Sequence, residues 1–175
     1  MRDEFKNPIT KAVHQLVEGI CYHYGSLKIK EAETDEVLAI TIWPHPGDAP
    51  LMVGKQGRTI KALEWLASRA GKLSHKPCYL SLEDGFSGNP KEPAGKIDLD
   101  LDVLKRLLAQ WTQLVFDCPV GMEFRNGNGE IRVYLNPAKA SPDDEIVIRA
   151  LDSLFFQYGK SNGCVVYIKS TQNSD

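Results

Sequence analysis

The sequence predicts an α+β protein built from two tandem units, each with the element order α-β-β-α-α-β and a three-stranded sheet packed on helices on one face. Three observations predict this. Stretches of helical periodicity alternate with stretches of period two, a segment rich in glycine and proline divides the chain, and the pattern then starts again. We expect a first domain at residues 1–83, a linker at 84–96 and a second domain at 97–175.

The first half contains every element of the predicted unit. Asn7 and Pro8 are typical of a helix start, and apolar residues at helical spacing follow as far as Gly25. Alternating apolar residues predict strands at residues 27–32, 37–43 and about 76–82. Before the third strand, prolines frame a short turn or helix at residues 44–53, and an apolar stripe that ends at Gly71 predicts a longer helix.

The second half shows the same sequence of patterns. Residues 84–96 contain three glycines and two prolines and are typical of a linker. Apolar stripes predict helices at residues 101–116, with Asp100 or Asp102 as cap, and about 143–158. Strands are predicted at residues 120–124, 130–135 and 164–169. Residues 125–129 predict a hairpin turn between the first two of these strands.

The two halves align in register. Pro137 lies 93 positions after Pro44, Ile148-Arg149-Ala150-Leu151 lies 88 after Ile60-Lys61-Ala62-Leu63, and Cys164 lies 86 after Cys78. The drop in offset from 93 to 88 corresponds to a five-residue deletion in the second half, and the deletion falls where that half reads Pro142-Asp143-Asp144-Glu145. We interpret the halves as two copies of one module. Small α/β modules that share element order by chance are the alternative.

Charge and composition restrict the function. The chain has 175 residues, a net charge of −2 and no apolar run long enough to span a membrane. Its scattered cysteines form no Cys-x-x-Cys pair, and no signal peptide is recognisable, which predicts a cytoplasmic protein with reduced cysteines and no metal. Residues 54–76 hold six cations and one acid, whereas residues 96–175 hold nine cations and eleven acids.

The basic segment begins with a glycine-bounded turn, Gly54-Lys55-Gln56-Gly57. Glycines allow a ligand to approach main-chain amides closely, and the following helix offers its N-terminal N–H groups. Lys55, Arg58 and Lys61 add positive charge. This combination predicts a site for an anionic backbone.

The turn with Arg58, placed after a proline-bounded segment and before an amphipathic helix, resembles a KH domain of the bacterial type II form. Over residues 7–83 the chain is similar to the small single-KH RNA-binding proteins of bacteria. The resemblance implies a non-catalytic protein, without cofactors, that binds about four nucleotides of single-stranded RNA in a groove between the helix and the second strand. The implied RNA-binding residues are Gly54, Lys55, Gln56, Gly57, Arg58 and Lys61, with Val53, Ile60 and Ile42 as candidates for an apolar floor under the bases. Core packing is the alternative for each of these last three.

The second half, on this interpretation, is a degenerate KH-like domain that lacks the GxxG loop. Small members of the family often self-associate, so a fused copy could replace a second subunit. Pro50-Leu51-Met52 departs from the family, which often has a lysine there, and could offer an apolar contact surface. The alternative function is a protein-interaction or ribosome-associated scaffold with a relic loop and a protein partner on the second module. Single-stranded DNA as ligand and the oligomeric state also stay open.

Several other patterns favour no further site. His14 and Glu18 are four apart on a helix, with no third metal ligand near in sequence, and a solvated helix face is the preferred interpretation. Asp98, Asp100 and Asp102 lack the glycine and glutamate that a calcium loop requires. No nucleotide-hydrolysis or nucleophile motif is present, so we expect no enzyme.

Overall fold

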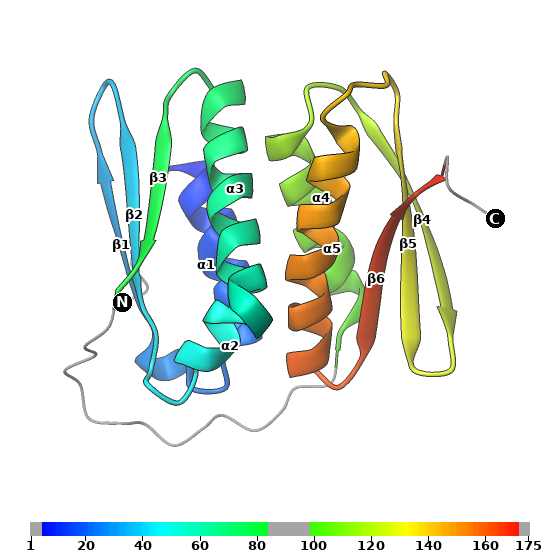
Figure 1. Ribbon diagram of the computed structural model, residues 1–175, viewed down its shortest axis with the longest axis horizontal. Coiled ribbons are helices and arrows are strands. Elements are labelled where there is room, and N and C mark those ends of the chain that lie inside the picture. The colour runs from blue at the N-terminus through cyan, green and yellow to red at the C-terminus, as the bar shows by residue number, and fades with distance from the viewer. Residues whose placement is uncertain (1–4, 84–98, 172–175) are drawn as a thin grey trace.

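The computed structural model describes residues 5–83 and 99–171 and consists of two three-stranded sheets with all the long helices between them. Figure 1 shows the sheets on the outside and the helices as two central layers. The predicted α+β fold, with each sheet packed on helices on one face, is confirmed. The predicted linker at residues 84–96 lies outside the described residues.

The first unit follows the predicted element order. Its elements are α1 (Pro8–Ile20), β1 (Lys28–Glu33), β2 (Leu38–Trp43), α2 (Ala49–Val53), α3 (Arg58–Leu73) and β3 (Cys78–Leu82). The Asn7 side chain accepts a hydrogen bond from the Ile9 N–H at 2.9 Å, as expected for the cap. Strand β2 lies in the centre of the sheet, antiparallel to β1 and parallel to β3.

The second unit has the same sheet topology with one helix fewer. Its elements are α4 (Leu101–Val115), β4 (Val120–Gly127), β5 (Glu130–Pro137), α5 (Asp144–Ser161) and β6 (Val165–Ser170). Strand β5 is antiparallel to β4 and parallel to β6. Residues 138–143 lead from β5 into α5 without a counterpart of α2, which is where the sequence alignment places the deletion.

The hairpin of the second unit is longer than the sequence predicts. The predicted turn covered residues 125–129, but the ladder continues to the pair Gly127 and Glu130. Asn128 and Gly129 have φ values of 50° and 77°, the left-handed region that a two-residue hairpin turn needs. Such a turn matches the twist of the strands, so β4 and β5 stay paired up to it.

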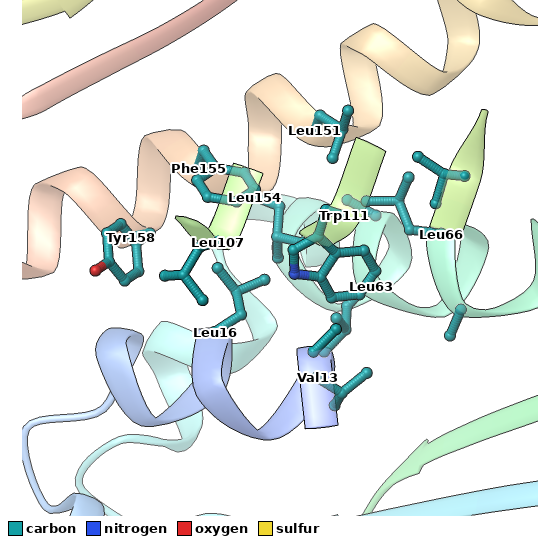
Figure 2. Packing of buried hydrophobic residues seen from close by; sticks show 14 of the residues in the cluster. Val13, Leu16, Leu63, Leu66, Leu107, Trp111, Leu151, Leu154, Phe155 and Tyr158 are labelled. Carbon is teal, nitrogen blue, oxygen red and sulfur yellow. The ribbon is translucent and has the colours of Figure 1, made fainter. Parts of the chain in front are cut away.

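The helices of both units share one hydrophobic core. Figure 2 shows Val13 and Leu16 of α1, Leu63 and Leu66 of α3, Leu107 and Trp111 of α4, and Leu151, Leu154, Phe155 and Tyr158 of α5 converging in it. Trp111 has no exposed surface, whereas Trp65 is half-buried against the cluster.

Helices α3 and α5 run in opposite directions along the interface between the units (Figure 1). At one end, the Arg69 guanidinium forms an ion pair with Asp143 at 3.0 Å and donates to the Val115 carbonyl at 3.2 Å. At the other end, the Asn162 side-chain amide donates to the Gly19 carbonyl at 2.9 Å. The two units are therefore held together by polar contacts at both ends of a shared apolar core.

No helix of the described residues is long and apolar enough to cross a bilayer.

Gly71 and Gly159 have the same structural role in the two units. A Cβ atom at Gly71 would lie 2.6 Å from the Cys78 nitrogen, and one at Gly159 would lie 2.7 Å from the Cys164 carbonyl oxygen. Both glycines therefore allow a helix to approach the strand that follows it. They are 88 positions apart, the same offset as the helix match, although the sequence pattern indicated only a helix end at Gly71.

We expect Gly71→Ala to destabilise the protein by at least about 1 kcal/mol, because the new methyl group would collide with backbone atoms that cannot move independently. This is a net loss, since alanine is favoured over glycine in a helix by roughly 0.8–1.0 kcal/mol. Gly127→Ala is the control, because a Cβ there meets no atom within 4 Å. Urea denaturation followed by circular dichroism measures both. An unchanged or raised midpoint for Gly71→Ala would contradict the close approach.

Candidate nucleic-acid interface

The turn between α2 and α3 has a backbone that depends on its glycines. Gly54, Gln56 and Gly57 all have positive φ values, of 73°, 56° and 74°. A Cβ atom at Gly54 would lie 2.2 Å from Oγ1 of Thr59, whose side chain is buried. Position 54 thus needs glycine both for its conformation and for the close packing of Thr59.

Two amide groups of the turn are available to a ligand. The Gly54 N–H donates to the Pro50 carbonyl at 2.9 Å, and the Gly57 N–H donates to the Gly54 carbonyl at 3.1 Å. Across residues 5–83 and 99–171, no acceptor is assigned to the N–H of Lys55 or Gln56. Helix α3 begins directly after the turn and adds the positive end of its dipole. The backbone alone therefore has the character of an anion site.

Three cations surround these amides. Lys55, Arg58 and Lys61 are exposed, and none of them forms an ion pair with an acid of the described ranges. The Lys61 side chain lies back along the turn, since its Cε would be 3.4 Å from a Cβ at Gly57. The positive charge of the three side chains is not neutralised within the protein, so it is available to an anionic ligand.

Other cations of the basic segment form ion pairs within the protein. Arg69 pairs with Asp143 of the second unit, and Lys76 pairs with Glu33 at 2.8 Å. Two of the three cations at the far end of this segment, Arg69, Lys72 and Lys76, are therefore engaged in ion pairs and do not extend the positive charge of the turn.

The structure places the three predicted floor residues at different depths. Val53 is 39% exposed beside the turn, and Ile60 is half-buried on the first turn of α3. Ile42 has no exposed surface and lies in the core, which agrees with the alternative interpretation of that residue. Met52 is fully buried, whereas Pro50 is exposed and Leu51 is half-buried, so Met52 takes no part in the apolar contact surface expected for this segment.

A buried carboxylate positions the helix before the turn. Asp48, whose side chain is 1% exposed, accepts hydrogen bonds from the N–H groups of His23 at 2.7 Å and Tyr22 at 3.2 Å. Its Oδ1 also lies 3.1 Å from His23 Nδ1, and the His23 and His45 rings stack at 4.1 Å. These contacts tie the end of α1 to the start of α2. Sequence reasoning missed Asp48, because its partners are about 25 residues away along the chain.

Cys21 lies beside this cluster. Burial raises the pKa of its thiol far above the ordinary value, and the negative charge of Asp48 raises the pKa further. Cys21 therefore stays a neutral thiol and acts as a small apolar residue of the core.

In the second unit, acids replace the turn and make structural contacts. The Asp144 carboxylate accepts from the Ser141 N–H at 2.8 Å, and Asp143 pairs with Arg69. Glu145 pairs with Arg149 one helical turn later. Asp144 and Glu145 thus make contacts at the start of α5, and Asp143 binds the first unit.

The described residues contain no group of three or more histidine, cysteine, aspartate or glutamate side chains arranged to hold a metal ion. The His14 ring, four residues before Glu18 on α1, packs against Phe5 with the ring centroids 5.2 Å apart. The chemistry offered by the site is therefore that of backbone amides, cations and a few apolar side chains.

Comparison with known proteins gives one informative relative. No family model matches the chain. The RNA-binding protein KhpA of Bacillus subtilis (strain 168) is 30% identical over 69 residues. The match covers 39% of this chain and 85% of that protein. The similarity thus spans most of the relative and a length of this chain close to that of one α/β unit.

Proposed function

This chain belongs to the family of the RNA-binding protein KhpA, and from that premise we propose that it is a non-catalytic protein that binds single-stranded RNA at the Gly54–Gly57 turn. One observation carries the proposal. Two main-chain N–H groups without an assigned acceptor and three cations without an ion-pair partner among the described residues meet at the start of a 16-residue helix. This arrangement suits a phosphate backbone.

The proposed contacts divide between phosphate and base. The N–H groups of Lys55 and Gln56, together with the side chains of Lys55, Arg58 and Lys61, hold the phosphates. Val53 and Ile60 present apolar surface to the bases, whereas Ile42 is buried in the core. Gly54 and Gly57 keep the turn free of side chains, so the backbone of about four nucleotides can approach it.

We further propose that the second unit is a degenerate copy of the first and acts as its intramolecular partner. The identical sheet topology and the matching roles of Gly71 and Gly159 support a common origin. Helices α3 and α5 pack antiparallel (Figure 1), which supports the role of partner, because buried apolar residues of both helices belong to one cluster.

The test is binding of five-nucleotide single-stranded RNA and DNA by the full chain at several salt concentrations. We expect RNA binding that weakens with salt, with a slope of roughly −0.7 in the logarithms for each phosphate contacted. Three contacts at the turn would give a slope of about −2. Equal affinity for DNA would assign the site to single strands in general. Absence of binding to either would favour the protein-interaction scaffold.

A further inference from the structure

The face of the first sheet that is turned away from the helices is basic and aromatic. Along each strand, core residues alternate with residues that point outward. We call the outward set the basic sheet face; its principal members are Lys28, Lys30, Thr41, Trp43, Tyr79 and Ser81. In Figure 1 this face is the outer side of β1, β2 and β3, with the helices on the other side.

The two lysines of this face lie over an aromatic ring. Lys28 is the cross-strand partner of Trp43, and the Nζ atoms of Lys28 and Lys30 are 5.7 and 5.9 Å from the centre of the Trp43 ring. A cation over a tryptophan face is held by the ring quadrupole and keeps its charge. The half-buried ring and the side chains of the two exposed lysines thus form one unit on this face.

No acid neutralises these lysines among the residues that the structure describes. The acids of β1 lie on the opposite side of the strand: Glu33 pairs with Lys76, and Glu31 accepts from the Asn7 N–H at 3.4 Å. Glu83 follows β3 and is exposed, but it forms no ion pair with either lysine. The charge of the face is available to a ligand.

Tyr79 provides a second aromatic group on the same face. It is 64% exposed, the most exposed of the large apolar side chains in the described ranges. Its neighbours across the sheet are Ala39 and then Ala32, which are too small to cover the ring. Tyr79 pairs with Ala39, four residues before Trp43, which separates the two aromatic positions by about 13 Å along the sheet.

The corresponding face of the second sheet is different. There Arg125 pairs with Glu123 at 2.7 Å, and Arg132 pairs with Glu130 at 3.0 Å. Arg125 also lies over the Tyr134 ring at 4.6 Å. Both outer faces thus carry cations and aromatic residues. The two arginines of the second sheet are paired with acids, whereas Lys28 and Lys30 of the first sheet are not paired with any acid of the described residues. The unneutralised charge of the first sheet is therefore not a requirement of the fold.

We propose that the basic sheet face is a second binding surface for single-stranded RNA, separate from the turn. Lys28 and Lys30 contact phosphates, and bases stack on Trp43 and Tyr79. Positive groups that follow the backbone and aromatic rings that accept bases are the two parts of a single-strand platform. The Gly54–Gly57 turn lies on the helix side of the first sheet, opposite the basic sheet face (Figure 1). Each surface therefore engages a different stretch of one RNA strand.

The test uses the full chain, a 20-nucleotide single-stranded RNA and ultraviolet cross-linking, with the linked peptides identified by mass spectrometry. We expect cross-links at Trp43 and Tyr79. Lys28→Glu with Lys30→Glu should remove these cross-links, lower affinity about tenfold and reduce the salt slope by about 1.4, since two phosphate contacts are lost. Lys139→Glu with Lys169→Glu is the control, because it makes the same charge change at exposed lysines of the second unit.

Tyr79→Ala gives an independent variant with no change of charge. It should lower the affinity for the 20-nucleotide RNA about tenfold through loss of one stacking contact. Circular dichroism of each variant checks that the fold is kept. If Tyr79→Ala and the double lysine variant both bind and cross-link like the parent, the proposal is wrong.

The outcomes separate this proposal from the function proposed for the turn. In a chain with Lys55→Asp and Gln56→Asp, cross-links at Trp43 and Tyr79 should persist at reduced affinity. Loss of the Trp43 and Tyr79 cross-links in that variant, or cross-links confined to the turn in the parent, would overturn the proposal for the basic sheet face. Either result would leave the proposal for the turn standing. Cross-links confined to the sheet would overturn the turn instead. A parent that binds no RNA, or lysine variants that alter only self-association, would overturn the sheet proposal.

Discussion

Replacing Lys55 and Gln56 by aspartate is expected to lower the affinity for a five-nucleotide single-stranded RNA at least about 100-fold. The change removes a cation and places two carboxylates beside N–H groups that have no assigned acceptor within the described residues. Hydrogen bonds to charged groups are worth roughly 1.5–3 kcal/mol each, so loss of the Lys55 side-chain contact, together with repulsion of the phosphate from the two N–H groups, accounts for that factor. Fluorescence anisotropy at fixed salt measures the loss.

The fold should tolerate this double change. Both side chains are exposed, and neither makes an ion pair with any residue that the structure describes. Gln56 has a φ of 56°, a conformation that aspartate adopts more easily than most residues. We therefore expect the free energy of unfolding to change by less than about 0.5 kcal/mol.

A matched control is Gln113→Asp with Lys139→Asp, which makes the same replacements at exposed positions of the second unit. This control should bind the short RNA as the parent does. If the control and the turn variant lose affinity equally, net charge explains the effect. If the turn variant binds like the parent, the turn is a relic, and a role in protein interaction becomes the better explanation.

The turn could be predicted from the sequence because its requirements are local. Two glycines, a proline-bounded segment and an amphipathic helix are contiguous, and the structure brings Lys55, Gln56, Arg58 and Lys61 together as that order implies. The support of the turn could not be predicted in this way. Asp48 gains its role only when the chain brings it to residues 22 and 23, and no periodicity signals that contact.

The same distinction applies to charge. The sequence showed an excess of cations at residues 54–76, and the structure shows which of them have partners. Arg69 is neutralised by Asp143, 74 positions away. Lys28 and Lys30 do not stand out in the sequence, because Glu31 and Glu33 follow them directly and balance their charge. Only the strand geometry, which places lysines and glutamates on opposite sides of β1, separates the two charges.

The arrangement of the two units was the least predictable part of the fold. Apolar stripes identified each helix, and periodicity identified each strand. A stripe shows that a helix face is buried, but not which partner covers it. Helix α3 could have been covered by its own sheet alone. Instead, Leu63 and Leu66 contribute to a cluster that includes Trp111 and Leu151 of the second unit.

Trp111→Ala should test whether the two units are one folding unit. Trp111 is the largest of the fully buried side chains, and it lies where helices of both units meet (Figure 2). Truncation of a buried tryptophan typically costs about 3–5 kcal/mol. Because the core is shared, we expect one urea transition at lower denaturant, detected together by circular dichroism and by fluorescence of Trp43 and Trp65. Two separate transitions would show that the units fold independently.

Trp111→Phe separates the lost volume from the lost hydrogen-bonding group. The Trp111 Nε1–H is buried and has no hydrogen-bond partner among the described residues. An unpaired buried donor is itself costly, by about 1–3 kcal/mol, so phenylalanine removes a penalty while it leaves a smaller cavity. We therefore expect Trp111→Phe to destabilise far less than Trp111→Ala. Equal losses would mean that the indole N–H makes a stabilising contact, and a loss below about 1 kcal/mol for alanine would contradict a shared core.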